Sequence, residues 1–245
     1  DLDKTLLRSD KTISPYTKTV LKLCQEQGIK VMVATARPQR TMEQYMKEIL
    51  FAGRTVSNGA RVFCGEEKRD IPISDEDVRR ILDILSQSEN LRITLETGDH
   101  AYSNLPIEEY ETTLSENLLE LAKKEGALKI LVHLEDALTG EMLKDRFPET
   151  VCCTVAHGTL LQVQHKEATK WNGVKAMLEF AGCSPKEAIY FGDDQDDVES
   201  IIGCGFGIAM PNGIEEVKKV ADDIAKSNDE DGVACYLFEH LLERW

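Results

Sequence analysis

The sequence predicts an α/β fold in which a Rossmann-like, doubly wound parallel sheet carries an inserted α+β unit. Near both ends of the chain, short and almost wholly apolar segments alternate with segments of helical periodicity. This rhythm is typical of a parallel sheet that helices cover on both faces. In the middle of the chain, several strand-length segments instead alternate apolar and polar residues, as in a sheet with one solvated face. We therefore expect the middle to be an insertion.

Length and composition exclude several classes of protein. The 245 residues are 42% hydrophobic and 30% charged, which is ordinary for a soluble protein with one large or two smaller domains. The net charge of −15 disfavours nucleic acid or an anionic membrane as partner. Seven cysteines without CxxC spacing fit a reducing cytoplasm better than disulfides or zinc. We expect a cytoplasmic protein, and no feature of the sequence indicates an oligomeric state.

The first part of the chain begins the predicted α/β rhythm. Ser14 and Pro15 are typical of a helix start, and Gly28 is typical of a helix end. The expected elements are a helix over 16–27, a strand over 29–34, a helix over 39–50 and a strand over 55–57.

The middle part has the features of an α+β unit. Ser74 followed by three acidic residues predicts a helix start, and Gly126 predicts a helix end. The expected elements are a hairpin over 61–73, helices over 75–87, 116–125 and 140–147, and strands over 91–96, 128–134, 151–155 and 160–164.

The first rhythm resumes at Lys170. The expected elements are helices over 170–181, 198–202 and 214–221, strands over 188–191, 206–210 and 223–225, and a helix at the C-terminus. We therefore predict a core domain of residues 1–64 plus 166–245 and an α+β cap domain of residues 65–165.

Polar residues follow three of the predicted core strands. Asp1 and Asp3 stand where a strand would end, residues 35–37 close a buried strand, and residues 192–197 contain four carboxylates. In open α/β sheets ligands bind beyond the carboxyl ends of the strands, so we expect these groups to converge. Converging carboxylates repel one another unless a cation lies between them. Oxygen ligands without histidine or cysteine favour a hard cation such as Mg²⁺, which commonly accompanies phosphate.

Four segments in this order carry a family resemblance. DLDKTLL at the start, VATARP at 33–38, Lys170 and FGDDQDD at 191–197 resemble the four motifs of the haloacid dehalogenase superfamily. The large insertion, with SNGA at 57–60 and SNDEDGVA at 227–234, resembles the Cof-type phosphatases, which carry a C2B cap. The resemblance implies a Mg²⁺-dependent phosphomonoester hydrolase that acts on small phosphorylated metabolites such as sugar phosphates.

The resemblance also implies a role for each matching residue. Asp1 would be the nucleophile that forms an aspartyl-phosphate, and Asp3 would be the general acid and base. The implied metal ligands are Asp1, Asp3 through its backbone carbonyl, Asp193 and Asp194. The implied phosphate-binding groups are the backbone amides of Leu2 and Ala36, Thr35, Lys170 and the residue at position 196. Asp197 would anchor Lys170.

Three departures from the family pattern leave alternatives open. Lys4 and Ala36 stand where the family usually has glycine, and Asp196 stands where it has an asparagine that donates to phosphate. A carboxylate cannot donate unless it is protonated. The alternatives are a phosphotransferase of the phosphomutase type and a catalytically weak binding or regulatory protein.

Two further points are expectations from position alone. Arg37 would either contact substrate or form a salt bridge, and His157 or His165 could approach substrate. Because the printed sequence begins at the nucleophile motif, we expect a hydrophobic strand to precede Asp1 in a longer chain.

Overall fold

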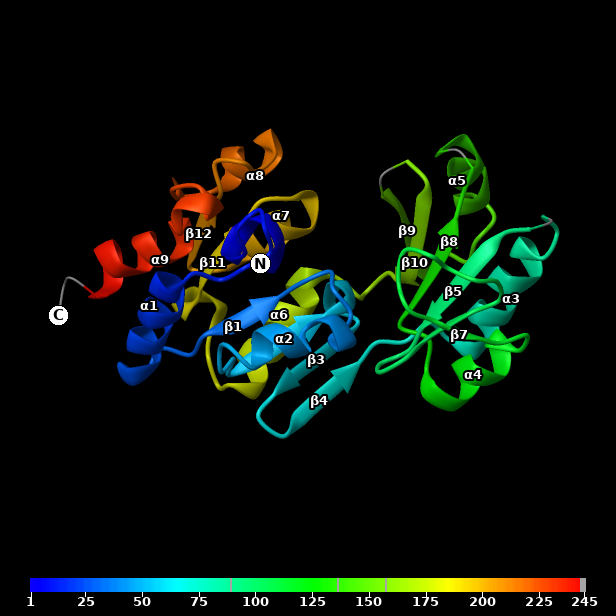
Figure 1. Cartoon of the computed structure of the whole chain (residues 1–245), viewed down its shortest axis with the longest axis horizontal. Coiled ribbons are helices and arrows are strands. Elements are labelled where there is room, and N and C mark those ends of the chain that lie inside the picture. The colour runs from blue at the N-terminus through cyan, green and yellow to red at the C-terminus, as the bar shows by residue number, and fades with distance from the viewer. Residues whose placement is uncertain (89, 136, 157, 243–245) are drawn as a thin grey trace. The chain divides into compact units, whose positions relative to one another are not determined.

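The computed structural model describes residues 1–88, 90–135, 137–156 and 158–242, and the chain divides into two compact units (Figure 1). Unit 1 consists of Asp1–Arg37, Thr41–Arg69 and Thr169–Trp245. Unit 2 consists of Pro38–Arg40 and Asp70–Ala168. Both ends of the chain therefore contribute to unit 1. Among the described residues, no helix has the length and apolar character that crossing a membrane requires.

The strands of unit 1 form two sheets. In the first, β1 pairs in parallel with β2, and β2 pairs antiparallel with β3. In the second, all three strands are parallel. The first sheet has the order β1 (Met32–Ala34), β2 (Gly53–Val56), β3 (Arg61–Cys64) and β4 (Glu67–Asp70), and the second has the order β11 (Ile189–Gly192), β12 (Phe206–Ala209) and β13 (Asp223–Ile224).

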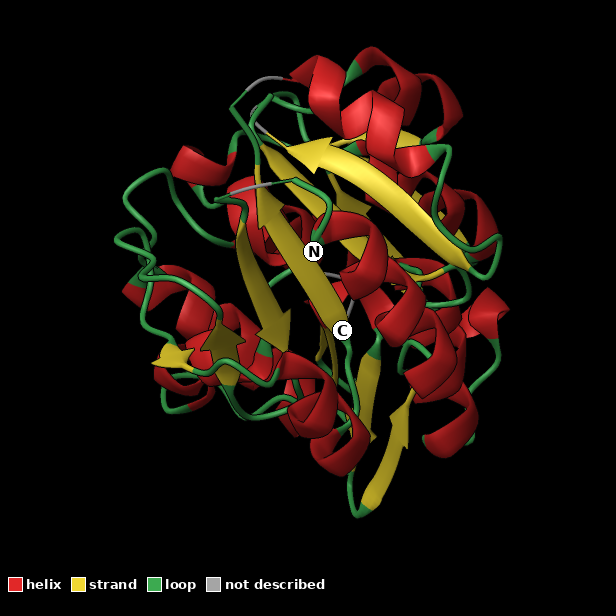
Figure 2. Cartoon of the chain, turned by 90° about the vertical axis from the view of Figure 1, so that its right-hand side faces the viewer, coloured by secondary structure: helices red, strands yellow, loops and turns green. Residues whose placement is uncertain are grey.

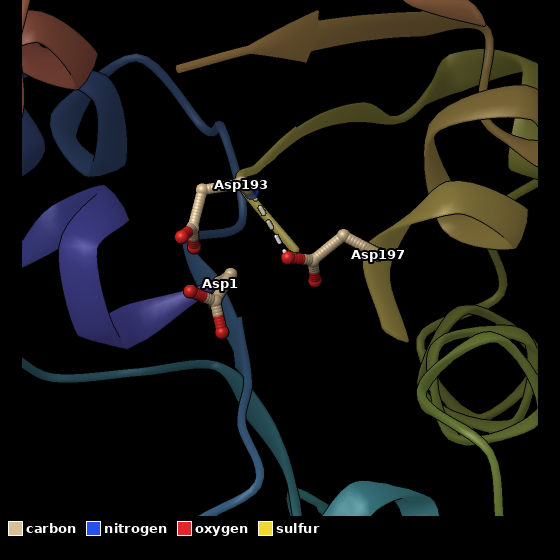
Figure 3. A group of neighbouring side chains, drawn as sticks. All are labelled: Asp1, Asp193 and Asp197. Atoms are coloured by element: carbon tan, nitrogen blue, oxygen red, sulfur yellow. Dashed lines mark hydrogen bonds between the residues drawn. The ribbon is translucent and has the colours of Figure 1, made fainter. Parts of the chain in front are cut away.

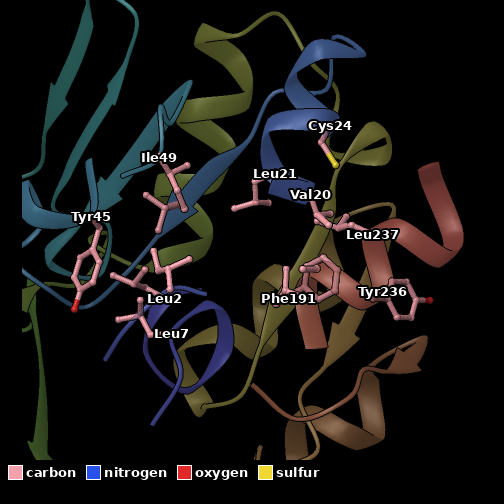
Figure 4. Close-up of a cluster of buried hydrophobic side chains, with 14 of the residues drawn as sticks. Leu2, Leu7, Val20, Leu21, Cys24, Tyr45, Ile49, Phe191, Tyr236 and Leu237 are labelled. Carbon is pink, nitrogen blue, oxygen red and sulfur yellow. The ribbon is translucent and has the colours of Figure 1, made fainter. Parts of the chain in front are cut away.

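Helices cover both faces of these sheets. Consecutive strand residues point to opposite faces, so Phe191 packs in one apolar cluster and Tyr190 in another. Figure 4 shows the first cluster, in which Phe191 lies near Val20 of α1 and Leu237 of α9. The helices are α1 (Pro15–Glu26), α2 (Glu43–Met46), α6 (Lys170–Phe180), α7 (Val198–Gly203), α8 (Glu215–Val220) and α9 (Gly232–Leu237). The predicted α/β fold is confirmed.

A cavity of about 430 Å³ lies between the two sheets of unit 1. Its lining is mainly apolar and includes Val33 of β1 and Phe191 of β11. Asp1 also lines the cavity, and its amino group donates a hydrogen bond of 2.7 Å to the carbonyl oxygen of Phe191. The start of the chain and the end of β11 are therefore neighbours.

Unit 2 is a six-stranded sheet with helices against one face (Figure 2). Apolar residues of the strands, such as Leu95 and Val132, share a buried cluster with Ile81 of α3 and Leu118 of α4. The sheet order is β7 (Thr113–Leu114), β6 (Ala101–Ser103), β5 (Arg92–Glu96), β8 (Lys129–His133), β10 (Leu160–His165) and β9 (Val151–Ala156), and the helices are α3 (Asp75–Leu85), α4 (Leu118–Glu125) and α5 (Ala137–Lys144).

The structure differs from several predicted bounds. The expected helix over 39–50 is a 3-10 turn at Gln39–Thr41 followed by the four residues of α2, although Met42, Tyr45 and Ile49 are buried at helical spacing. Periodic burial alone therefore does not require a continuous helix. The strand expected over 29–34 begins at Met32, and β6 and β7 were not predicted because they are too short to show a period.

The prediction that one face of the unit 2 sheet is solvated holds only in part, because Thr154 on that face is exposed while other polar residues of the face are not. Thr94, Glu96 and Lys129 on that face are all buried. Arg40 pairs with Glu96 at 2.7 Å, and the Tyr110 hydroxyl donates to Thr94 Oγ1 at 3.0 Å. Polar partners, rather than water, therefore satisfy these strand residues.

Candidate active site

Three carboxylates converge at the end of β11 (Figure 3). Asp193 follows this strand directly, Asp197 lies in the turn before α7, and Asp1 begins the chain. One oxygen from each residue lies within 4.8 Å of the others. The site thus forms where the sequence predicted it, beyond the carboxyl end of a parallel strand.

Lys170 is the cation of this site. It is the first residue of α6, and its Nζ donates to Asp1 Oδ1 and to Asp197 Oδ1, both at 2.8 Å. The side chains of Lys170, Asp1 and Asp197 are 5%, 5% and 0% exposed, so little water screens the two ion pairs. Lys170 is therefore held between the two carboxylates.

Asp197 is the most heavily hydrogen-bonded of the three carboxylates. Besides Lys170 it accepts from the Tyr190 hydroxyl at 2.7 Å and from the backbone amides of Asp193 and Asp194 at 3.0 and 3.1 Å. Burial opposes ionisation, but the charge and hydrogen bond of Lys170 and the hydrogen bond from Tyr190 keep the pKa of Asp197 below its ordinary value. Asp197 is therefore a buried ion-pair partner of Lys170, and its role as the anchor of Lys170 stays a prediction.

The charges of the site fit a divalent cation. Three ionised carboxylates and one ammonium group sum to −3 + 1 = −2. Burial, and then the negative charge of Asp197, raise the pKa of Asp193, and a cation beside Asp193 would oppose both effects. Carboxylate oxygens are ligands that hard divalent cations prefer. Because Asp197 is already bound by four donors, Asp1 and Asp193 are the residues of this group that fit a metal ligand role best.

The Asp3 carboxylate is bound by two cations. Arg37 donates to both of its oxygens at 2.6 and 2.7 Å, and Lys11 donates at 2.8 Å. Burial would raise the pKa of Asp3, but the hydrogen bonds from Arg37 and Lys11 lower it to about 2. Of the two alternatives for Arg37, the structure contains the salt bridge.

The residues with predicted phosphate contacts lie around the end of β1 and the start of the chain. Thr35 is buried directly after β1, its amide donates to the Thr55 carbonyl at 2.9 Å, and its hydroxyl accepts from the Arg37 amide at 3.2 Å. Ala36 is exposed, and Leu2 is fully buried. The loop after β1 is therefore held by its neighbours while Ala36 faces solvent.

Two acidic residues of the loop before α7 have local partners. Asp194 accepts from the Gln195 amide at 2.8 Å and so caps the turn that follows it. Asp196 is exposed and accepts from the Asn58 side-chain amide at 2.6 Å. Lys4, the other departure from the family pattern, has a left-handed φ of 59°, which is a conformation that glycine adopts more easily.

Sequence reasoning missed three residues of this site. The Thr5 hydroxyl donates to Asp193 Oδ1 at 3.2 Å, Tyr190 donates to Asp197, and Asn58 donates to Asp196. Of these three residues, only Asn58 could have been found from the sequence, because it lies in the SNGA segment that resembles the family. Of the two histidines, His157 lies outside the described residues, and the His165 ring accepts from the Glu167 amide at 3.2 Å.

Comparison with known proteins identifies the class. The sequence profile of the haloacid dehalogenase-like hydrolases matches residues 1–237. The chain is 28% identical to 5-amino-6-(5-phospho-D-ribitylamino)uracil phosphatase YitU of Bacillus subtilis, over 98% of this chain and 96% of that protein. The crystal structure of TM0651 from Thermotoga maritima has a TM-score of 0.87 at 25% identity, and covers 100% of this chain and 95% of that one. The HAD subclass IIB sugar phosphatase BT4131 shares the fold, with a TM-score of 0.82 at 21% identity over 98% and 96% of the two chains.

Because the family profile covers nearly the whole chain, the chain belongs to the haloacid dehalogenase-like hydrolases. Within that superfamily it is a phosphatase of the Cof type. Enzymes of this superfamily generally use a divalent metal, and Asp1, Asp193 and Asp197 form a carboxylate cluster among the described residues.

Proposed function

We propose that this phosphatase hydrolyses phosphomonoesters of small phosphorylated metabolites, such as sugar phosphates, with Mg²⁺ as its metal. The observation that carries the proposal is the buried ion pair of Asp1 and Lys170 beside Asp193. A buried cation touching the nucleophile fits a reaction in which negative charge gathers on phosphate. The similarity to YitU, whose name specifies a phosphorylated ribitylamino-uracil, supports a small metabolite as substrate.

In the proposed first step an oxygen of Asp1 attacks phosphorus, and the bond from phosphorus to the ester oxygen breaks. Asp3 donates a proton to that leaving oxygen, and in the second step removes a proton from the water that hydrolyses the aspartyl-phosphate. Inorganic phosphate leaves, and Asp1 is regenerated. Because Arg37 and Lys11 bind Asp3 in the structure, this role requires Asp3 to leave these partners.

The remaining residues of the proposed site bind phosphate and metal. Thr35, Lys170 and the backbone amides of Leu2 and Ala36 would hold the phosphoryl oxygens. Mg²⁺, held by Asp1 and Asp193 with the Asp3 carbonyl and Asp194 as further ligands, would neutralise charge on the phosphoryl group. Asp197 would keep Lys170 in position.

The test is phosphate release from a panel of phosphorylated metabolites, with Mg²⁺ and with a chelator. Asp1→Asn removes the nucleophile with little change in size, and Asp10→Asn is a matched control at an exposed aspartate. We expect release to require both Mg²⁺ and Asp1 and to be unaffected by Asp10→Asn. Release that persists in Asp1→Asn, or no release from folded wild-type protein, would overturn the proposal.

A further inference from the structure

The turn Ser57–Gly59, which follows β2, has an unusual backbone. All three of its residues have a positive φ, with values of 49° for Ser57, 55° for Asn58 and 94° for Gly59. Glycine adopts such angles freely, but two consecutive residues with side chains are strained there. Strain of this kind persists only when surrounding contacts hold it, so the contacts of this turn need explanation.

The backbone of the turn binds the loop after β1. The Ser57 amide donates to the Arg37 carbonyl at 2.8 Å, and the Asn58 amide donates to the Thr35 carbonyl at 3.1 Å. The loop that contains Thr35 is therefore fixed to the turn at two points.

The same turn packs against the start of α6, which carries Lys170. A Cβ atom on Gly59 would lie only 1.9 Å from the carbonyl oxygen of Thr169. A Cβ atom on Gly173, one turn further along α6, would lie 3.1 Å from Gly59 Cα. No side chain fits between the turn and the helix, so the position of Lys170 depends on this close approach.

The Asn58 side chain adds a contact with the loop before α7. Its Nδ2 donates to Asp196 Oδ2 at 2.6 Å, and Asn58 itself is 9% exposed. A carboxylate can only accept, so the amide nitrogen must face it. Among the described residues, no donor reaches the buried Oδ1 of Asn58. The bond to Asp196 is thus kept although it leaves a buried acceptor without a partner, which is unfavourable.

We propose that Asn58 is a positioning residue of the phosphate site, an inference that rests on the proposed function. Its backbone fixes the Thr35 loop, its neighbour Gly59 sets the distance to Lys170, and its side chain holds the Asp196 carboxylate. The contact with Asp196 also explains how this chain can have a carboxylate where the family has asparagine. The amide binds one carboxylate oxygen and restrains a charge that would otherwise repel phosphate.

The first experiment replaces only the side chain. Asn58→Gly keeps the left-handed backbone without strain and removes the amide, so the variant is expected to fold. Asn90→Gly is the matched control, because Asn90 is an exposed asparagine of unit 2 with a φ of 63°. We expect Asn58→Gly to raise KM and the Kd of inorganic phosphate by roughly tenfold with a smaller change in kcat. We expect Asn90→Gly to change none of them.

The second experiment exchanges the two side chains. Asn58→Asp places two carboxylates against each other and is expected to weaken phosphate binding at least as much as Asn58→Gly. The double variant Asn58→Asp with Asp196→Asn restores a hydrogen bond with its donor reversed. We expect it to regain phosphate affinity to within about threefold of the Asp196→Asn single variant. Because the readout is the Kd of inorganic phosphate, such a rescue would connect the hydrogen bond between positions 58 and 196 to phosphate binding and not only to stability.

The outcomes separate this inference from the proposed function. Inorganic phosphate binding is measured by titration calorimetry and does not depend on turnover. If wild-type protein binds phosphate but hydrolyses no ester, the proposed function fails and Asn58 is still judged by the phosphate Kd. An unchanged Kd in folded Asn58→Gly, failure of the exchange to rescue, or no phosphate binding by the wild type would overturn the inference.

Discussion

Replacing Asp197 with asparagine is expected to lower the free energy of unfolding of unit 1 by about 3–5 kcal/mol. The Asp197 side chain is fully buried and accepts from Lys170, Tyr190 and two backbone amides at 2.7–3.1 Å. Asparagine has one acceptor oxygen instead of two, and its amide nitrogen would face donors. Lys170 would then be buried with Asp1 as its one remaining charged partner at this site, which is the cause of the large cost.

Urea unfolding followed by tryptophan fluorescence measures this effect. The chain has two tryptophans, and Trp171 lies next to Lys170 in α6 of unit 1. In a Trp245→Phe background, Trp171 reports the unfolding of unit 1 alone. Asp196→Asn is the matched control, because it makes the same chemical change at an exposed position one residue away. Its expected cost is below about 1 kcal/mol.

The result for Asp197→Asn can refute the reasoning directly. A decrease in the free energy of unfolding of less than about 1 kcal/mol is what an exposed ion pair contributes, and it would contradict the role of Asp197 as a buried anchor. A cost equal to that of Asp196→Asn would have the same meaning. The pH gives a second check: the lowered pKa means that the stability from Asp197 is complete above its unfolded pKa and is lost as the pH falls below it.

Three further predictions follow from single features of unit 1. Lys4→Gly is expected to stabilise the protein by about 1 kcal/mol in thermal unfolding, because glycine adopts the left-handed φ of 59° without strain. Lys4→Ala is the control, since it removes the charge but keeps the strain. Equal stability of the two variants would contradict this prediction. Because Asp3 has a pKa of about 2 instead of 3.8, its contribution to stability is lost as the pH falls through this interval. Arg37→Gln should therefore reduce the loss of stability between pH 3.8 and about pH 2, measured as acid unfolding by circular dichroism. An acid unfolding curve identical to that of the wild type would count against the ion pair. An extension of about six residues of alternating valine and isoleucine before Asp1 is expected to enter the apolar cavity that Val33 and Phe191 line, and to raise the unfolding temperature. A glycine–serine extension of equal length should not, and equal temperatures would show that the cavity takes no strand.

Local sequence signals accounted for most of the elements of the fold. Ser14 and Ser74 cap their helices in the structure, and Gly28 and Gly126 follow helix ends with a positive φ. These signals are readable because a cap or a left-handed glycine acts within a few residues of itself. Sequence patterns did not predict the extent of α2, or the strands β6 and β7, because these elements are only two to four residues long. They also did not predict that polar residues of the unit 2 sheet are buried, because that depends on partners distant in the sequence.

The sequence by itself determined which chemical groups lie at the strand ends of this phosphatase and in what order. Asp1, Lys170 and Asp193 could be identified because each lies at the edge of a local element. Only the tertiary structure decided their partners: Asp3 binds Arg37, Asp197 collects four donors, and Asn58 holds Asp196. The physical reason is that the decisive contacts join segments that are distant along the chain: 27 residues separate Lys170 from Asp197, 34 separate Asp3 from Arg37, and 138 separate Asn58 from Asp196. Their geometry is set by how the strands and helices of unit 1 pack, and periodicity and capping carry no information about it.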